Sequence, residues 1–297
     1  MTRHAFLFPA IVALMAVLVP APAPAAAVTI ADDRGREVVM QAPPQRIISL
    51  YGGLTEILVA LDLGPRVAAR TRGDDLLSQL PTVGTHLQPN LEMILALRPD
   101  LVLQGGVKKG QVGIPRLEQQ GIPVAVFAPT DFAGLFATIS RLGKLTGREE
   151  KAQALIRDME ARLEAVSRKV ARRPAPGVFY EVRYHNLLAA GQGSIVHDII
   201  TRAGGRNIVG APQKLVAFSF ETLIQTDPEV YVIQKGPMNR SPQEVQTRSH
   251  YELLKAVRGN RVLVVEESLF SRPGPRSVEA VEQLARFLHP DAPWGKP

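Results

Sequence analysis

One long amphipathic helix is predicted near the middle of the 297-residue chain, over residues 148–170. It begins with the acidic pair Glu149-Glu150 and ends with the basic pair Arg168-Lys169, the order of charges that suits a helix dipole. At about 1.5 Å per residue, some 23 residues make a rod of roughly 35 Å. The segment Pro174-Ala175-Pro176-Gly177 ends the helix. A rod of this length leaves one segment of domain size on either side.

Both of these segments alternate between short apolar strands and amphipathic helices. Such alternation favours βαβ units and parallel sheets. We therefore predict an α/β fold with two Rossmann-like lobes joined by a single long backbone helix and a ligand cleft between the lobes. The predicted strands are a hairpin at 28–30 and 37–40, then 46–50, 66–69, 101–103, 124–127, 178–181, 230–233 and 262–265. The other predicted helices are 54–61, 91–97, 114–120, 131–145, 194–203, 220–226, 251–257 and 275–288.

The N-terminus is predicted to be a targeting segment. Arg3 and His4 precede an apolar run, Ala10 to Val19, and then small residues and prolines, the pattern of a cleavable secretory signal. The run is too short to span a bilayer, although an uncleaved anchor is the alternative. The predicted divisions are a signal peptide at 1–27, an N-terminal lobe at 28–147, a connecting helix at 148–173 and a C-terminal lobe at 174–297.

The chain has no cysteine, which excludes several kinds of site and modification. Without cysteine there is no disulfide framework, thiolate metal site, cysteine nucleophile or lipidated cysteine. We therefore expect a protein exported to the periplasm without a lipid anchor. The net charge is +7, and the basic residues are scattered rather than gathered in a block with aromatics, so a nucleic-acid partner is not expected. The excess of positive charge indicates either simple solubility or an anionic ligand.

A repeat relates the two halves of the chain. The first copy runs from Asn90-Leu91-Glu92 to Pro99-Asp100-Leu101-Val102-Leu103, and the second from Ser219-Phe220-Glu221 to Pro228-Glu229-Val230-Tyr231-Val232. Each copy has an N-cap residue two positions before a glutamate, then a short helix, a proline, an acid and a buried strand. A first-turn glutamate can simply complement a helix dipole. Two of them at matching positions suggest paired contact points for a two-fold partner.

Several further segments form a recognisable set with the first repeat copy. They are the hairpin, Arg46-Ile47-Ile48-Ser49-Leu50, Leu54-Thr55-Glu56, Leu80-Pro81-Thr82-Val83-Gly84, Gly191-Gln192-Gly193-Ser194, Ala203-Gly204-Gly205-Arg206-Asn207 and Arg272-Pro273-Gly274-Pro275-Arg276. In these segments, from about Val28 to Pro290, the chain resembles the helical-backbone class of ABC-importer solute-binding proteins. The resemblance implies a carrier of ferric siderophores, cobalamin or haem, in which one glutamate in each lobe docks into arginine pockets on the two permease subunits. By motif position these glutamates are Glu92 and Glu221.

Ligands of open α/β sheets lie beyond the carboxyl ends of the strands, and this rule selects the candidate binding residues. Arginine suits carboxylates and phosphates. His86 stands where cobalamin-binding relatives place a stacking aromatic, and tyrosine and histidine can both ligate haem iron. Surface or packing roles are the alternative at each position. The candidates are Tyr51, Arg70, Arg72, His86, Tyr184, His185, Lys235 and Arg272, with Lys214 as a further cation near the same pocket.

Four other side chains receive local interpretations. Ser194 is expected to cap the helix that follows it, and Phe270 to be a packing aromatic. His250 and His289 are expected at the surface. No cluster of histidines and acids indicates a site for a free metal ion, so neither a metal site nor a cofactor is predicted.

The sequence therefore predicts a monomeric periplasmic binding component of an ABC importer. It would capture a metal chelate and deliver it to the permease dimer. The first candidate ligand is a ferric siderophore, the second is cobalamin or haem, and the third is an oxyanion. The permease would be its only contact with the membrane. A sensory or interaction protein of the same fold is the alternative. An enzyme is not expected, because no G-x-S-x-G or H-E-x-x-H motif occurs. Since one stiff helix joins the lobes, we expect little closure on binding.

Overall fold

The computed structural model describes residues 27–106 and 113–295. The N-terminal lobe contains a hairpin, β1 (Val28–Ala31) with β2 (Glu37–Met40), and a parallel four-stranded sheet in the order β4-β3-β5-β6. The hairpin was predicted, and so was the parallel sheet. The sheet strands are β3 (Ile47–Ser49), β4 (Val67–Ala69), β5 (Leu101–Gly105) and β6 (Val124–Phe127), and the helices are α1 (Gly52–Ala60), α2 (Leu91–Ala96), α3 (Gly113–Gln119) and the short η1 (Gly64–Arg66).

The C-terminal lobe is built on a mixed sheet. Its path is β10-β8-β7-β11-β12, and β9 also pairs with β7. The central strands β7, β11 and β12 are parallel, whereas β8 is antiparallel to both of its neighbours. The strands are β7 (Gly177–Arg183), β8 (Leu188–Ala190), β9 (Arg206–Asn207), β10 (Leu215–Ala217), β11 (Val230–Lys235) and β12 (Val262–Glu266). The helical segments are α6 (Ile195–Arg202), α7 (Phe220–Thr226), η2 (Val245–Thr247), η3 (Tyr251–Leu253), α8 (Lys255–Arg258), α9 (Glu267–Phe270) and α10 (Ser277–Leu288).

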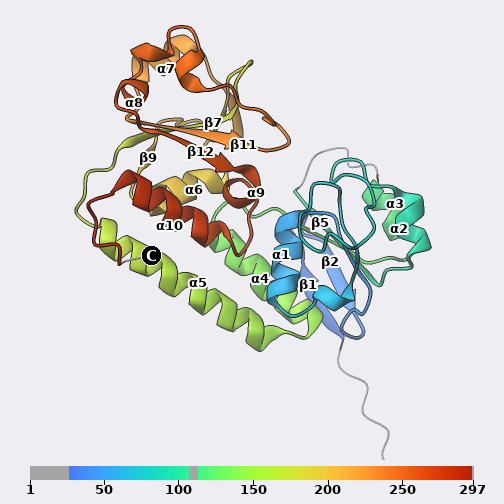
Figure 1. Cartoon of the computed structure of the whole chain (residues 1–297). Helices are drawn as coiled ribbons and strands as arrows, with labels where there is room; N and C mark the ends of the chain where they lie inside the picture. Colours follow the sequence, from blue (N-terminus) through green and yellow to red (C-terminus); the bar gives the residue numbers. More distant parts are fainter. Residues whose placement is uncertain (1–26, 107–112, 296–297) are drawn as a thin grey trace, which may run out of the picture.

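Two consecutive helices connect the lobes. α4 (Phe132–Thr146) ends at Gly147, which has a left-handed conformation, and α5 (Glu149–Val170) follows almost at once. The predicted long helix is thus present, and Figure 1 shows it running along the C-terminal lobe beside α10, with its other end next to α4 and the N-terminal lobe. The predicted domain boundaries themselves stay a prediction.

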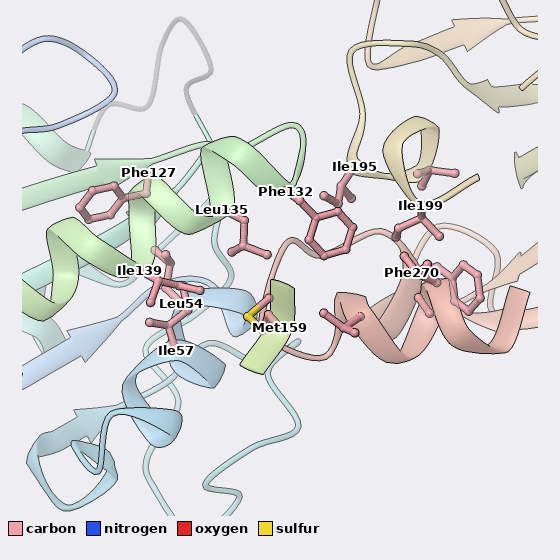
Figure 2. Packing of buried hydrophobic residues seen from close by; sticks show 14 of the residues in the cluster. Leu54, Ile57, Phe127, Phe132, Leu135, Ile139, Met159, Ile195, Ile199 and Phe270 are labelled. Atoms are coloured by element: carbon pink, nitrogen blue, oxygen red, sulfur yellow. The ribbon is translucent and has the colours of Figure 1, made fainter. Parts of the chain in front are cut away.

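Buried apolar side chains continue from one lobe into the other. Phe132 at the start of α4 packs in one cluster with Ile195 and Ile199 of α6, and the cluster extends to Leu54 of α1 (Figure 2). A polar contact supports the same joint, because the Phe132 amide donates to Asp198 Oδ2 over 2.8 Å. A shared apolar core resists the separation of the two lobes.

The structure corrects three local expectations from the sequence. The helix predicted at 251–257 is interrupted at Leu254, whose backbone is extended, because the Asp227 carboxylate accepts from the Lys255 amide and begins α8 there. The closing helix begins at Ser277 rather than at 275, after the unforeseen short helix α9. Ser194 occupies the N-cap position of α6, but its hydroxyl donates to the Gly191 carbonyl instead of capping.

His289 is buried, which also corrects the sequence expectation, whereas His250 is exposed as expected. The His289 ring nitrogen Nε2 lies 3.2 Å from the Gly204 carbonyl, and Gly204 has a φ of 81° that favours glycine. The Trp294 indole donates to the His289 carbonyl and holds the chain end against the same place. His289 therefore closes the packing between α6 and α10.

Acid is expected to destabilise the fold through His289. Burial lowers the pKa of His289 from its ordinary 6.5, Arg173 and Arg261 act in the same direction, and the Gly204 hydrogen bond opposes them. The unfolded chain therefore binds this proton more readily, so stability falls as the pH drops below about 6.5. The substitution His289→Gln should reduce that fall. Urea unfolding of both proteins at pH 7.5 and 5.5 measures it, and an equal fall in the two proteins would contradict the assignment.

The predicted signal peptide lies outside the described residues, apart from its last position, Ala27. Within the described part of the chain, no helix is both long enough and apolar enough to cross a bilayer.

Candidate functional site

Tyr51 and His86 meet at the carboxyl edge of the N-terminal sheet. Tyr51 lies two residues after the end of β3, at the start of α1, and its half-buried ring packs on Gly105 at the end of β5, where any Cβ would overlap the ring. The exposed His86 ring lies edge-on to it, with centroids 5.9 Å apart and an interplanar angle of 70°. The structure thus brings together two of the residues selected from the sequence.

Arg272 reaches from the C-terminal lobe to the N-terminal lobe. Its Nη1 donates to the Gly73 carbonyl over 2.5 Å, while Nε and Nη2 donate to the two carboxylate oxygens of Glu267 over 3.2 and 2.7 Å. Burial raises the pKa of Tyr51, Glu267 raises it further, and Arg272 opposes both. Tyr51 is therefore a neutral phenol, and the two charged groups that act on it most strongly, Glu267 and Arg272, come from the opposite lobe.

The loop after Arg272 makes a second contact between the lobes. Glu56 on α1 is 7% exposed, and its carboxylate accepts from Nε and Nη2 of Arg276 over 3.0 and 2.6 Å. Burial raises the pKa of Glu56, and the hydrogen bonds from Arg276 oppose that rise. A Cβ on Gly53 would overlap the Pro273 carbonyl, so only glycine allows this close approach. The Arg272 to Arg276 segment, noted in the sequence for its pattern, is thus packed directly on the first turn of α1.

Arg70 and Arg72 have different surroundings. The guanidinium of Arg70 donates to the Asp74 carbonyl over 2.6 Å and to the Ser78 carbonyl over 3.0 Å, so it orders its own loop. Arg72 is exposed, and its backbone amide donates to Gly84. Contact of either arginine with a ligand stays a prediction.

Three predicted ligand residues follow strands of the C-terminal lobe. Tyr184 and His185 come after β7 with ring centroids 5.0 Å apart; Tyr184 is half-buried and His185 is exposed. Lys235 ends β11, where its Nζ lies 3.9 Å from Glu266 Oε1 at the surface. Gly236 then passes so close to Glu267 that a Cβ would overlap that side chain. These contacts place the end of β11 beside the Glu267–Arg272 pair.

A fully buried ion pair lies behind Tyr184, and the sequence analysis did not find it. Arg248 Nη1 and Nη2 donate to Glu181 Oε2 and Oε1 over 2.5 and 3.0 Å, and both side chains are 0% exposed. Tyr231 adds a third hydrogen bond to the same carboxylate over 2.6 Å. One signal was available, since Glu181 stands inside the buried apolar strand Val178 to Val182 and so required a buried partner.

The two glutamates of the repeat occupy matching positions in the structure. Glu92 lies in the first turn of α2, where Asn90 Oδ1 accepts from the Met93 amide over 3.1 Å. Glu221 lies in the first turn of α7, where Ser219 Oγ accepts from Thr222 over 3.0 Å. Both glutamates are exposed. Hydrogen bonds from its own amide and from Ser219 lower the pKa of Glu221, so the carboxylate is ionised at neutral pH.

The second acid of each repeat copy has a structural role. Asp100 precedes β5 and accepts from the amides of Gln45 and Arg46, over 2.6 and 2.9 Å, at the entry to the neighbouring β3. Glu229 precedes β11 and accepts from Gly177, over 2.8 Å, at the start of the neighbouring β7. Equivalent carboxylates therefore fix the start of equivalent strand pairs, β3 with β5 and β7 with β11.

Residues 47–269, well over half of the chain, match the family described as periplasmic binding protein. The chain belongs to this family. Membership confirms the resemblance inferred from the motifs, and solved relatives with TM-scores above 0.7 confirm the two-lobed α/β fold class.

Two curated relatives of this periplasmic binding protein cover most of the chain. "Uncharacterized ABC transporter substrate-binding lipoprotein YvrC" of Bacillus subtilis is 28% identical over 89% of the chain and 86% of its own length. The "Vitamin B12-binding protein" of Vibrio campbellii is 27% identical over 83% of the chain and 90% of its own length. Both names describe binding proteins rather than enzymes.

Two solved structures are similar over nearly their whole length. A periplasmic haem-binding protein from Pseudomonas aeruginosa is 28% identical with a TM-score of 0.76, covering 84% of this chain and 94% of that one. A protein of an ABC-type Fe3+-hydroxamate transport system from Saccharomonospora viridis is 27% identical with a TM-score of 0.74, covering 88% and 98%. Within residues 27–106 and 113–295 there is no group of three or more histidines and acids that could hold a metal ion.

Proposed function

We propose that this periplasmic binding protein captures a metal chelate between its lobes and delivers it to the permease of an ABC importer. Delivery would use Glu92 and Glu221. The matching positions of these two exposed carboxylates, one on each lobe, are the observation that carries the proposal. A carboxylate that meets an arginine at an interface steers and orients docking. The named ABC-transporter relatives support the same partner.

The proposed ligand site lies where Tyr51, His86 and Arg272 meet, with Tyr184, His185 and Lys235 on the C-terminal side. Guanidinium and ammonium groups bind carboxylates, catecholates and other anionic oxygens well. A ferric siderophore is the first candidate, and the Fe3+-hydroxamate relative supports it. The relatives that bind vitamin B12 and haem support cobalamin or haem as the second candidate. An oxyanion is the third.

The remaining proposals concern location and assembly. The signal pattern and the absence of cysteine support a monomer exported to the periplasm without a lipid anchor, although the Bacillus subtilis relative is named a lipoprotein. No catalytic activity is proposed. A sensory protein of the same fold would bind a membrane partner without feeding transport, and permease and ATPase genes beside this one would distinguish the two roles.

A thermal-shift panel tests the ligand class. The mature protein would be heated with a ferric hydroxamate, a ferric catecholate, haemin and cobalamin. A ligand at 100 times its Kd adds about 2.7 kcal/mol of stability. At about 2–4 °C per kcal/mol for a chain of this size, the melting temperature should rise by several degrees with one chelate class. A flat panel would contradict chelate capture and would favour an oxyanion or the sensory role.

A further inference from the structure

The arginine of the buried ion pair beneath Tyr184 has partners on several sides. Arg248 gives its in-plane donors to Glu181 and to the Gln243 carbonyl, the latter through Nε over 3.2 Å and Nη2 over 2.8 Å. Its Cζ lies over the Tyr184 ring, 3.9 Å from the ring centroid, and 5.2 Å from the centroid of the Tyr251 ring. The donors are therefore satisfied in one plane while a tyrosine covers the group from above.

This arrangement fixes the Tyr184 ring from its inner side. The Arg248 side chain is fully buried and Tyr184 is half-buried, so the tyrosine is the member of this pair that reaches the surface, where the exposed His185 ring lies 5.0 Å from it at 41°. Glu181 belongs to β7, the strand that ends directly before Tyr184, so the ion pair is tied to the same rigid element. Tyr251 contacts Tyr184 edge-on, at 5.9 Å and 79°, and limits rotation of the ring on a second side.

The charge beneath the ring also changes what its outer face attracts. A cation on one face of an aromatic ring is drawn to the negative π-cloud. It withdraws electron density from the opposite face, which then repels an electron-rich ring less. Glu181 neutralises the guanidinium overall, so the favoured occupant of that face is a flat, conjugated, electron-rich ligand rather than any anion. Ferric catecholates and haem have such surfaces, whereas a ferric trihydroxamate has no aromatic plane.

We propose that Arg248 is a positioning residue that, with Glu181, presents Tyr184 as a stacking surface for a flat, conjugated, electron-rich metal chelate. The inference rests on the proposed function and narrows its ligand class. Arg248 itself is buried and does not touch the ligand. A purely structural Arg248 would tie the segment around Gln243 to β7, and its removal would weaken the fold without discriminating between ligands.

The test compares three probes, haemin, a ferric tris-catecholate and the ferric trihydroxamate ferrioxamine B, in binding titrations. The charge-balanced pair Glu181→Gln with Arg248→Met removes the guanidinium without leaving a buried charge unpaired. Tyr184→Leu removes the stacking ring. We expect the pair variant and Tyr184→Leu each to raise the Kd for at least one flat chelate about tenfold. Because the ion pair acts through Tyr184, the variant that combines all three substitutions should have a Kd no higher than that of Tyr184→Leu alone.

The control is Arg162→Met with Glu282→Gln. It removes another ion pair with two hydrogen bonds, over 2.9 and 2.8 Å, between α5 and α10, and the Kd should stay within about twofold of wild type. If the Glu181 and Arg248 pair variant does not fold, Arg248→Lys keeps the charge and loses the flat guanidinium. Its affinity for the flat chelates should also fall about tenfold.

The outcomes separate the two proposals. If wild type binds a flat chelate and the pair variant binds it equally well, Arg248 has no positioning role. If wild type binds only ferrioxamine B, the inference is wrong and the proposed function stands. If wild type binds none of the three probes and no other chelate, both proposals are wrong.

Discussion

Charge reversal at both repeat glutamates, Glu92→Arg with Glu221→Arg, is expected to abolish uptake while chelate binding stays at the wild-type level. Both side chains are exposed in the first turns of α2 and α7, so the change disturbs no core. Each introduced arginine would face the arginine pocket that the family resemblance implies on the permease. Like charges brought together at an interface cost several kcal/mol, and each 1.4 kcal/mol lowers the affinity about tenfold. Uptake of the labelled chelate by cells that carry the variant in place of wild type should fall at least about a hundredfold.

The matched control reverses two exposed glutamates on the connecting helix α5, Glu150→Arg and Glu160→Arg. It makes the same change in net charge and should leave uptake within about twofold of wild type, as expected for surface sites away from an interface. Normal uptake by the docking variant would contradict the assignment of these helices to the permease contact. A loss of chelate binding in the purified variant would show that the glutamates act on the ligand instead.

Removal of the Phe132 side chain is expected to cause the largest loss of stability of any single change discussed. The ring is 0% exposed, and its cluster includes Leu135, Ile195 and Ile199 where the two lobes join (Figure 2). A buried phenylalanine replaced by alanine costs about 3–5 kcal/mol, because the apolar contacts are lost and a cavity remains. Urea unfolding monitored by circular dichroism should show a loss of this size for Phe132→Ala.

Phe136→Ala is the control for this prediction. Phe136 lies one turn further along the same helix, with its ring centroid 6.1 Å from that of Phe132, but it is only half-buried. Its removal should cost clearly less, about 1–2 kcal/mol. Equal losses for the two variants would mean that the apolar joint between the lobes does not hold the fold together in the way described.

Local patterns predicted the elements and the docking helices because their causes lie within a few residues. Asn90 and Ser219 cap helices through amides three positions ahead, so spacing alone placed Glu92 and Glu221 in first turns. The strands of the parallel sheets were found because buried strands are continuous apolar runs. The short strands β8, β9 and β10 were missed, because β8 pairs antiparallel with its neighbours β7 and β10, outside the βαβ alternation that identified the other strands, and β9 has only two residues.

The contacts of the site could not be predicted because they join residues far apart in the sequence. Arg272 contacts Gly73, and Arg276 contacts Glu56, across intervals set only by the packing of two lobes. Glu181 inside an apolar strand indicated a buried cation, but nothing local selected Arg248 from the 35 lysines and arginines of the chain. His289 is likewise buried through its contact with Gly204, a residue far from it in the sequence.

The central claim is that a metal chelate binds between the lobes without large closure. The direct measurement is a crystal structure of the mature protein with the chelate that gives the largest thermal shift, superposed on the free protein. We expect the chelate beside Tyr51, His86 and Arg272, with a rotation between the lobes below about 15°, because the lobes share an apolar core. A chelate bound elsewhere on the molecule, or a rotation well above about 15°, would contradict the account.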